Sequence, residues 1–207
     1  MGFQYITIER EYGSGGTKIA RRLAEECGIS CFGEEILEAV SKKLDIPVER
    51  IQRYEETVSN SFLYTVLILS RAQEGNADMV TRDGHIFVAE QQEIKTLAAF
   101  GPAVFIGHCA SEALKDQNTI RVFIRCSDSQ TKARRITEDY GIPEKNVEST
   151  RSRFDNKRAK YYYANTTKKW DDFSNYDVVL DSAKLGIEGC VSVLKGIFME
   201  RTGNDRA

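Results

Sequence analysis

The chain has 207 residues, of which 29% are charged, and its formal net charge is only −2. This length suits one sizeable domain, and the near-neutral balance argues against a general binder of nucleic-acid polymers, whose surface is basic overall. No apolar run approaches the roughly 20 residues that cross a bilayer, and the N-terminus leads directly into an apolar strand. We therefore expect a cytoplasmic protein that binds neither membranes nor nucleic-acid polymers.

Cysteine and histidine are scarce and scattered. The five cysteines are odd in number and form no C-x-x-C pair, and the chain has two histidines. Such spacing favours reduced thiols that pack as small apolar groups, and it disfavours a zinc site.

Segments with strand and helix character alternate from one end of the chain to the other. We predict strands at 4–9, 29–32, 78–81, 102–107, 120–126 and 176–181. We predict helices from the glycine-rich turn to Cys27 and at 34–44, 48–58, 60–74, 85–99, 128–140, 143–164 and 186–201. This alternation is typical of an α/β fold, in which helices cover both faces of a parallel sheet.

Two regions interrupt the alternation. Residues 34–75 contain three predicted helices and no strand, which indicates a subdomain over one side of the sheet. Residues 143–174 are rich in basic and aromatic side chains. There, Arg151, Asp155 and Arg158 share one helix face, with the carboxylate between two guanidiniums.

A glycine-rich turn joins the first predicted strand to the first helix. The turn is formed by Gly13, Ser14, Gly15 and Gly16, and Thr17 follows it. Such a turn directs backbone N–H groups inward at the positive end of a helix, where they can hold the phosphates of a nucleotide. The hydroxyl of Thr17 stands where a ligand of Mg²⁺ is needed.

The turn departs from the phosphate-loop pattern G-x-x-x-x-G-K-[ST] at two positions. The first glycine of that pattern falls on Arg10, and its lysine falls on Gly16. Arg10 and Lys18 are the candidate substitutes for the missing cation. We favour Arg10, because Lys18 is already within the helix, where its side chain points away from the turn.

The chain resembles the cytidylate kinase-like proteins over nearly its whole length. The resemblance is carried by the strand, turn and helix at 6–20, by the segment 104–110, by Arg134-Arg135, by the Arg151…Asp155…Arg158 set and by 175–181. It implies a three-layer P-loop kinase fold with a five-stranded parallel sheet. It also implies a helical monophosphate-binding insert at about 34–75 and a lid at about 143–170.

The resemblance implies ATP and Mg²⁺ as cofactors and a nucleoside monophosphate, CMP or dCMP, as the acceptor. On that basis, Gly13 to Thr17 cradle the ATP phosphates, and Thr17 ligates the metal. The catalytic set is Arg10, Arg151, Asp155 and Arg158. Lys18 and Arg135 are assigned to the nucleotide side of the site, and His108 and Gln92 to the acceptor side.

Three positions differ from the family pattern. Gly16 replaces the loop lysine, His108 replaces an arginine that contacts the monophosphate, and Gly33 replaces an aspartate after the second strand. Three readings therefore stay open: a nucleoside-monophosphate kinase, a nucleotide sensor without catalysis, and a kinase for another small-molecule acceptor. Trp170, near the base of the lid, is interpreted as either a packing or a gating residue, and a homodimer is also an open alternative.

Overall fold

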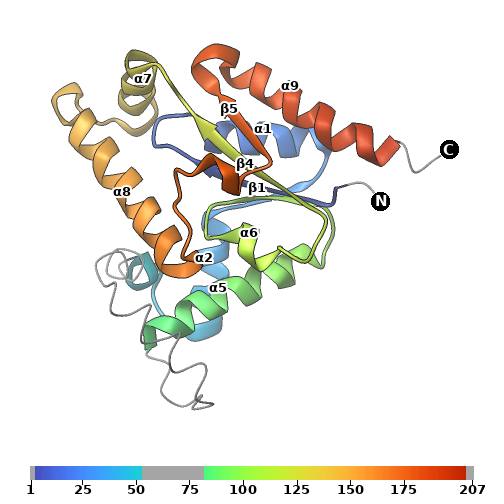
Figure 1. Cartoon of the computed structure of the whole chain (residues 1–207). Coiled ribbons are helices and arrows are strands. Elements are labelled where there is room, and N and C mark those ends of the chain that lie inside the picture. Colours follow the sequence, from blue (N-terminus) through green and yellow to red (C-terminus); the bar gives the residue numbers. More distant parts are fainter. Residues whose placement is uncertain (1–2, 53–81, 204–207) are drawn as a thin grey trace.

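The computed structural model describes residues 3–52 and 82–203, which form an α/β fold around a parallel sheet (Figure 1). The strands are β1 (Tyr5–Arg10), β2 (Ser30–Phe32), β3 (Ala103–Ile106), β4 (Thr119–Arg125) and β5 (Val178–Asp181). Their order is β2-β3-β1-β4-β5, and every pairing is parallel. The five-stranded parallel sheet and the α/β class are thus as predicted.

Seven α-helices have bounds within the described residues. They are α1 (Gly16–Cys27), α2 (Glu34–Leu44), α5 (Arg82–Ala98), α6 (Ala110–Ala113), α7 (Ser129–Tyr140), α8 (Val147–Thr166) and α9 (Ser182–Gly203). Short 3₁₀ turns, η2 (Glu144–Asn146) and η3 (Phe173–Asn175), precede α8 and β5, and residues 48–52 are also helical.

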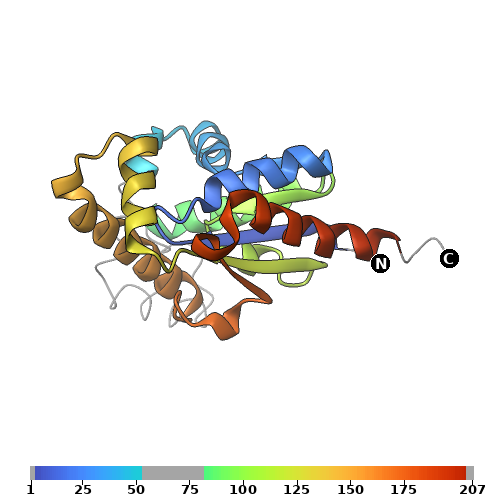
Figure 2. The same cartoon turned by 90° about the horizontal axis from the view of Figure 1, so that it is seen from above.

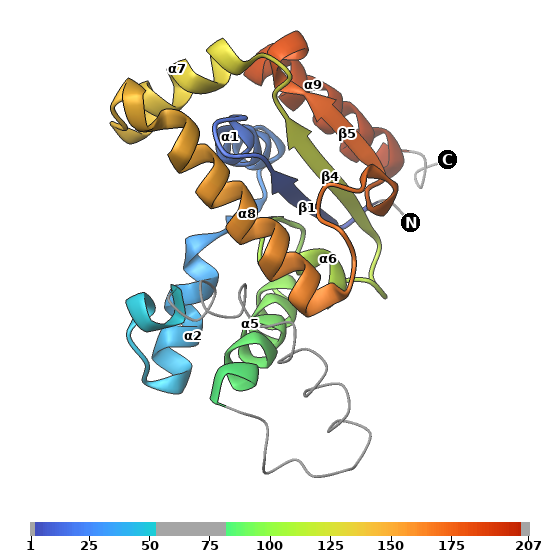
Figure 3. The same cartoon turned by 60° about the vertical axis from the view of Figure 1, so that its left-hand side comes forward.

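Helices cover both faces of the sheet (Figure 2). On one face, α1 and α9 pack over alternate residues of the central strands, among them Ile6 and Ile8 of β1. On the other face, α5 and α6 pack over Tyr5 and Phe105, and an aromatic group that includes Trp170 surrounds Phe123. Helix α8 lies across the carboxyl ends of β1 and β4 (Figure 3). The carboxyl edge is where ligands bind in open α/β sheets.

Several elements differ from the sequence-based expectation. Helix α8 begins at Val147 rather than at 143, because a 3₁₀ turn occupies Glu144–Asn146. The last helix begins at Ser182 rather than at 186, because the Asp181 carboxylate accepts a hydrogen bond from the Ala183 N–H and starts the helix early. Gly186 then interrupts it with φ 69° and ψ 178°. The four-residue helix α6 was not predicted, since so short a segment shows no helical period. The predicted strand 78–81 and helix 60–74 lie outside the described residues, as does most of the helix predicted at 48–58.

All five cysteines are free thiols, as expected. Across residues 3–52 and 82–203, no group of three His, Cys, Asp or Glu side chains is arranged to hold a metal ion. Over the same ranges, every helix is too short or too polar to cross a membrane.

Candidate functional site

The turn between β1 and α1 requires its glycines. Gly13 and Gly15 both have φ +78°, a left-handed conformation that side chains with a Cβ rarely adopt. A Cβ on Gly13 would lie 2.7 Å from Cγ1 of Ile136, and one on Gly15 would lie 2.4 Å from Cδ1 of Ile187. The turn is therefore both sharp and closely packed from outside.

The turn presents several backbone donors at the start of α1. The Ser14 N–H donates to the Glu11 carbonyl at 3.2 Å, and the Gly16 N–H donates to Oγ of Ser14 at 3.3 Å. Among the residues that the structure describes, none accepts a hydrogen bond from the N–H groups of Gly13, Gly15 or Thr17. Open N–H groups at the positive end of a twelve-residue helix suit a phosphate anion.

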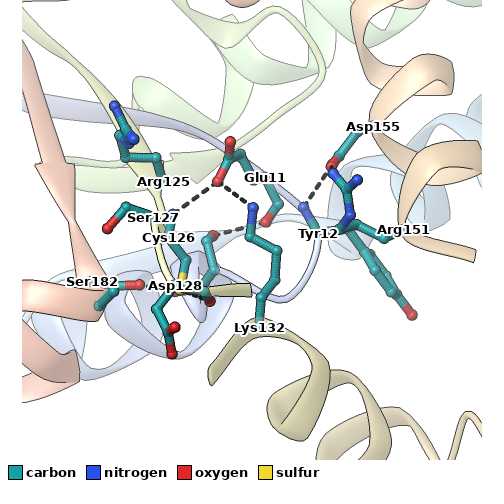
Figure 4. Close-up of polar contacts among 12 residues, drawn as sticks. Glu11, Tyr12, Arg125, Cys126, Ser127, Asp128, Lys132, Arg151, Asp155 and Ser182 are labelled. Atoms are coloured by element: carbon teal, nitrogen blue, oxygen red, sulfur yellow. Dashed lines mark hydrogen bonds and ion pairs between the residues drawn. The ribbon is translucent and has the colours of Figure 1, made fainter. Parts of the chain in front are cut away.

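A carboxylate within the turn anchors it to the neighbouring strand and helix. Oε2 of Glu11 accepts hydrogen bonds from the Cys126 N–H at 2.8 Å and from the Lys132 ammonium at 2.9 Å (Figure 4). The side chain of Lys132 is only 10% exposed. This pair could not be predicted from the sequence, because Lys132 follows an exposed helix start and has the pattern of an ordinary surface lysine.

Two cations that we assigned to the nucleotide side have other contacts. Arg135 donates to the Ser14 carbonyl at 3.0 Å and to Oγ of Ser182 at 2.9 Å, so it connects the turn to the start of α9. The Lys18 ammonium binds Asp139 at 2.6 Å on the surface. Lys18 therefore points away from the turn, in line with the preference for Arg10.

The side chain of Arg10 fills the space that a lysine at position 16 would need. A Cβ on Gly16 would lie 2.5 Å from Cβ of Arg10 and 2.9 Å from its Cγ. The Arg10 guanidinium continues to the end of β3, where Nη1 would lie 2.5 Å from a Cβ on Gly107. Nε of Arg10 is buried and has no hydrogen-bond partner within the described chain. A side chain at position 16 and the Arg10 side chain would therefore compete for the same space.

Helix α8 is docked on the turn. Oδ1 of Asp155 accepts a hydrogen bond from the Tyr12 N–H at 2.7 Å (Figure 4), and Arg158 donates to the Arg10 carbonyl at 2.9 Å. The Tyr12 ring is stacked between Phe154, at a centroid distance of 4.5 Å, and Tyr140, at 4.8 Å. The basic face predicted for this helix therefore meets the turn directly.

The predicted Arg151, Asp155 and Arg158 set forms one cluster. Asp155 lies 3.6 Å from Arg151 and 3.8 Å from Arg158, measured between the nearest charged atoms. Arg151 is turned outward and forms a second ion pair with Glu148. Burial, and next the positive charge of Arg10, lower the pKa of Arg158 to about 10. An anion bound between the guanidiniums of Arg10 and Arg158 would reduce the repulsion between them.

Burial raises the pKa of Asp155 above its ordinary value, despite the Tyr12 N–H and Arg158, which favour the charged form. A raised folded-state pKa means that this group stabilises the fold most below its unfolded pKa, near 4, and that the contribution is lost as pH rises through the folded pKa. We expect Asp155→Asn, which keeps an acceptor for Tyr12, to melt at the same or a higher temperature than the wild type at pH 7. The difference should vanish as pH falls toward about 4, as followed by circular dichroism. A variant that melts well below the wild type at pH 7 would contradict this.

A cavity of about 380 Å³ opens beside Arg10 and α8. It is lined by Glu9, Arg10, Glu34, Leu37, Gln52, Gly107, His108, Phe154, Lys157, Arg158, Tyr161 and Tyr162. Its walls thus combine three cations, two carboxylates and several aromatic rings. Such a mixture suits a small anionic molecule that also has an apolar part and polar hydrogen-bonding groups.

The two residues assigned to the acceptor lie differently. His108 lines the cavity and belongs to a run of three left-handed residues, Gly107 to Cys109. Gln92 lies on the exposed face of α5 and does not line the cavity, whereas its neighbour Gln91 donates to the His108 carbonyl at 2.9 Å. The structure therefore brings His108, but not Gln92, to the cavity.

Several solved structures are similar to this chain. An uncharacterized protein from Eubacterium ventriosum ATCC 27560 has a TM-score of 0.69 and 25% identity, and the match covers 95% of this chain and 99% of that one. Shikimate kinase from Bacteroides thetaiotaomicron has a TM-score of 0.51 and 13% identity, with 94% and 98% covered. TT1252 from Thermus thermophilus has a TM-score of 0.52 and 14% identity, with 98% and 100% covered. No curated protein matches the chain.

The model of the cytidylate kinase-like family matches residues 5–184, which include the glycine-rich turn, the strands of the sheet and helix α8. Together with the P-loop kinase architecture of the fold, this match agrees with the resemblance found in the sequence. The chain therefore belongs to the cytidylate kinase-like family.

Proposed function

We propose that this protein transfers a phosphoryl group from ATP to a nucleoside monophosphate, with CMP and dCMP as the first candidates. Membership of the cytidylate kinase-like family supports phosphoryl transfer as the chemistry. The choice of acceptor rests on the resemblance and on the cavity beside the turn, whose three cations suit a phosphate and whose rings suit a base.

The turn fits a triphosphate, since the N–H groups of Gly13, Gly15 and Thr17 have no acceptor in the described part of the chain. Thr17, together with the phosphates themselves, would hold Mg²⁺. When bound, the ion would neutralise charge on the phosphates. We assign residues 34–75 to the monophosphate-binding insert and 143–170 to the lid.

One observation carries the proposal: the Arg10 side chain occupies the volume that a loop lysine at position 16 would need, and it lines the same cavity as Arg158. Phosphoryl transfer requires little covalent chemistry from the protein, so cations that are already in place supply most of the stabilisation of the transition state. In this scheme Arg10 and Arg158 bind the transferred group, and Asp155 orients Arg158 and connects it to the turn. Stacking of Phe154 on Tyr12 excludes water from that side.

The test is direct detection of products after purified protein is incubated with Mg²⁺-ATP and CMP, dCMP, UMP, AMP, GMP or shikimate. We expect a diphosphate to form from CMP or dCMP, and we expect Arg158→Ala to reduce its formation by at least about 10³-fold, within the range for a cation that contacts the transferred group. Equal turnover by the wild type and Arg158→Ala would contradict the proposal. Saturable ATP binding without product from any acceptor would favour a nucleotide sensor.

A second candidate is a kinase for another small-molecule acceptor. Two observations favour it: His108 stands in the cavity where the family pattern has arginine, and the Gly33 N–H is closed off by Oε2 of Glu35 at 2.8 Å. The acceptor side of the site therefore differs more from the family pattern than the phosphate side does. Product from shikimate, but from no nucleotide in the panel, would select this candidate.

A further inference from the structure

Glu9 is a buried carboxylate beside the cavity. It lies on β1 directly before Arg10, is 8% exposed and lines the cavity. The other residues on its face of the strand, Tyr5 and Thr7, are uncharged. An ionised group buried at this level is costly unless it has compensating partners. A carboxylate kept at such a position is therefore a candidate for function.

The described residues satisfy only part of the hydrogen-bonding capacity of the Glu9 carboxylate. Its Oε2 accepts a hydrogen bond from Nε1 of Trp170 at 3.1 Å, and no other residue of the described chain donates to its side chain. A carboxylate can accept about four hydrogen bonds. Trp170 is itself fixed, because it is 5% exposed and packs edge-on against Phe123 at 5.0 Å between ring centroids. Between packing and gating, the contacts therefore favour packing, with the added effect of holding Glu9 in place.

Glu9 affects the pKa values of several neighbouring groups. Burial raises the pKa of Tyr162 to about 12, and the charge of Glu9 is the next cause. Burial followed by the same charge raises the pKa of Tyr176, whereas Glu9 favours the charged form of Arg158. Glu9 therefore shares its surroundings with the phenols of Tyr162 and Tyr176 and with the Arg158 guanidinium.

The lining of the cavity suits two different parts of one acceptor. Arg10, Lys157 and Arg158 attract its phosphate. A carboxylate repels a second anion and a carbonyl oxygen, but it binds a group that donates a hydrogen bond. We propose that Glu9 is an acceptor-binding residue that takes a hydrogen bond from an O–H or N–H group of the acceptor, and that Trp170 is its positioning residue. This inference rests on the proposed function and names a specificity determinant within it.

The donor belongs either to a sugar hydroxyl or to an exocyclic amine. A site built around a buried acceptor discriminates strongly against an analogue that lacks the donor, because the carboxylate is then left without a partner. CMP carries both groups, 2′,3′-dideoxy-CMP lacks the sugar hydroxyls, and UMP replaces the amine with a carbonyl. Comparing the three ligands separates the two sources.

Trp170 supplies the measurement, because it is the single tryptophan of the chain and it contacts Glu9 directly. We expect CMP to change the tryptophan fluorescence of the wild type, and we expect one of the two analogues to bind about 10- to 100-fold more weakly, as for a hydrogen bond to a charged group. Glu9→Gln should weaken CMP binding by a similar factor and bring CMP and that analogue to nearly equal affinity. Equal CMP affinity before and after Glu9→Gln would overturn the inference.

Glu138→Gln is the matched control, since Glu138 is exposed on α7 and does not line the cavity. We expect it to change CMP affinity less than about threefold, as for a solvent-exposed charge. Glu34 also lines the cavity, so a loss with Glu34→Gln and none with Glu9→Gln would assign the contact to Glu34 and overturn our proposal. Trp170→Phe keeps the carboxylate but removes its donor, so we expect calorimetry to show a smaller loss than with Glu9→Gln. Thermal unfolding confirms that each variant is folded.

The failures of the two proposals are distinguishable. If the wild type converts CMP to product and Glu9→Gln leaves its affinity and selectivity unchanged, Glu9 is a structural residue and the kinase function stands. If the wild type neither binds CMP nor forms product from any acceptor in the panel, both proposals are overturned.

Discussion

Replacing Arg10 with alanine should lower kcat by about 10²- to 10³-fold while changing ATP affinity by much less, because a donor that stabilises the transition state acts mainly on the chemical step. The position of the Arg10 side chain supports a larger effect on kcat than on ATP affinity. Arg10 starts at the end of β1, passes over Gly16 and ends at Gly107, beside the cavity rather than under the helix. Single-turnover kinetics would separate chemistry from binding. Equal and small losses in kcat and in ATP affinity would show that Arg10 is only structural.

Moving the cation gives the matched control. Arg10→Gly removes both the charge and the side chain that blocks position 16, and Gly16→Lys then returns a lysine to the place where the phosphate-loop pattern has it. We expect the double variant to recover part of the turnover that Arg10→Gly loses. Gly16→Lys alone should not raise turnover, because Cβ of Arg10 would lie only 2.5 Å from the new Cβ. If the double variant recovered no turnover, Arg10 would not perform the function of a loop lysine.

The second large effect concerns stability. Gly16→Ala should lower the free energy of unfolding by about 1–3 kcal/mol, the usual cost of overpacking, because the atoms it meets belong to the first two carbons of the Arg10 side chain. Cβ of Arg10, the nearer of the two at 2.5 Å, is fixed by the backbone and cannot rotate away. Urea denaturation followed by circular dichroism measures the change.

Gly196 provides the comparison, since it is exposed on α9 and a Cβ there would meet nothing within 4 Å. Gly196→Ala should therefore stabilise the protein by up to about 1 kcal/mol through helix propensity alone. In an Arg10→Gly background, Gly16→Ala should lose most of its cost, which a double-mutant cycle would show as coupling. Absence of coupling would mean that the strain at position 16 comes from elsewhere.

Much of this site could be predicted from local sequence. The turn, the individual strands and the basic face of α8 each depend on residues close together in the chain, where glycine conformations and residue spacing are informative. The preference for Arg10 over Lys18 also followed from local geometry, because a side chain committed to a helix has a known direction.

The rest depended on contacts between distant residues. Glu11 meets Lys132 across 121 positions, and Glu9 meets Trp170 across 161. Neither pair leaves a periodic pattern, and each charged partner looks like a solvated residue until the packing buries it. Gln92 was assigned to the acceptor but does not line the cavity, because the face of α5 that meets the loop after β3 could not be identified from the sequence.

The contacts between the glycine-rich turn and helix α8 also bear on the order in which parts of the protein fold. The residues that lead into the turn bind partners far along the chain. The Tyr12 N–H donates to Asp155, 143 positions later, and the Arg10 carbonyl accepts from Arg158, 148 positions later. Contacts of such long range form late, because the chain must first close a large loop. During synthesis, the glycine-rich segment would remain without its supports until α8 had emerged. Bound nucleotide would therefore stabilise the completed fold and would not contribute to the early stages of folding.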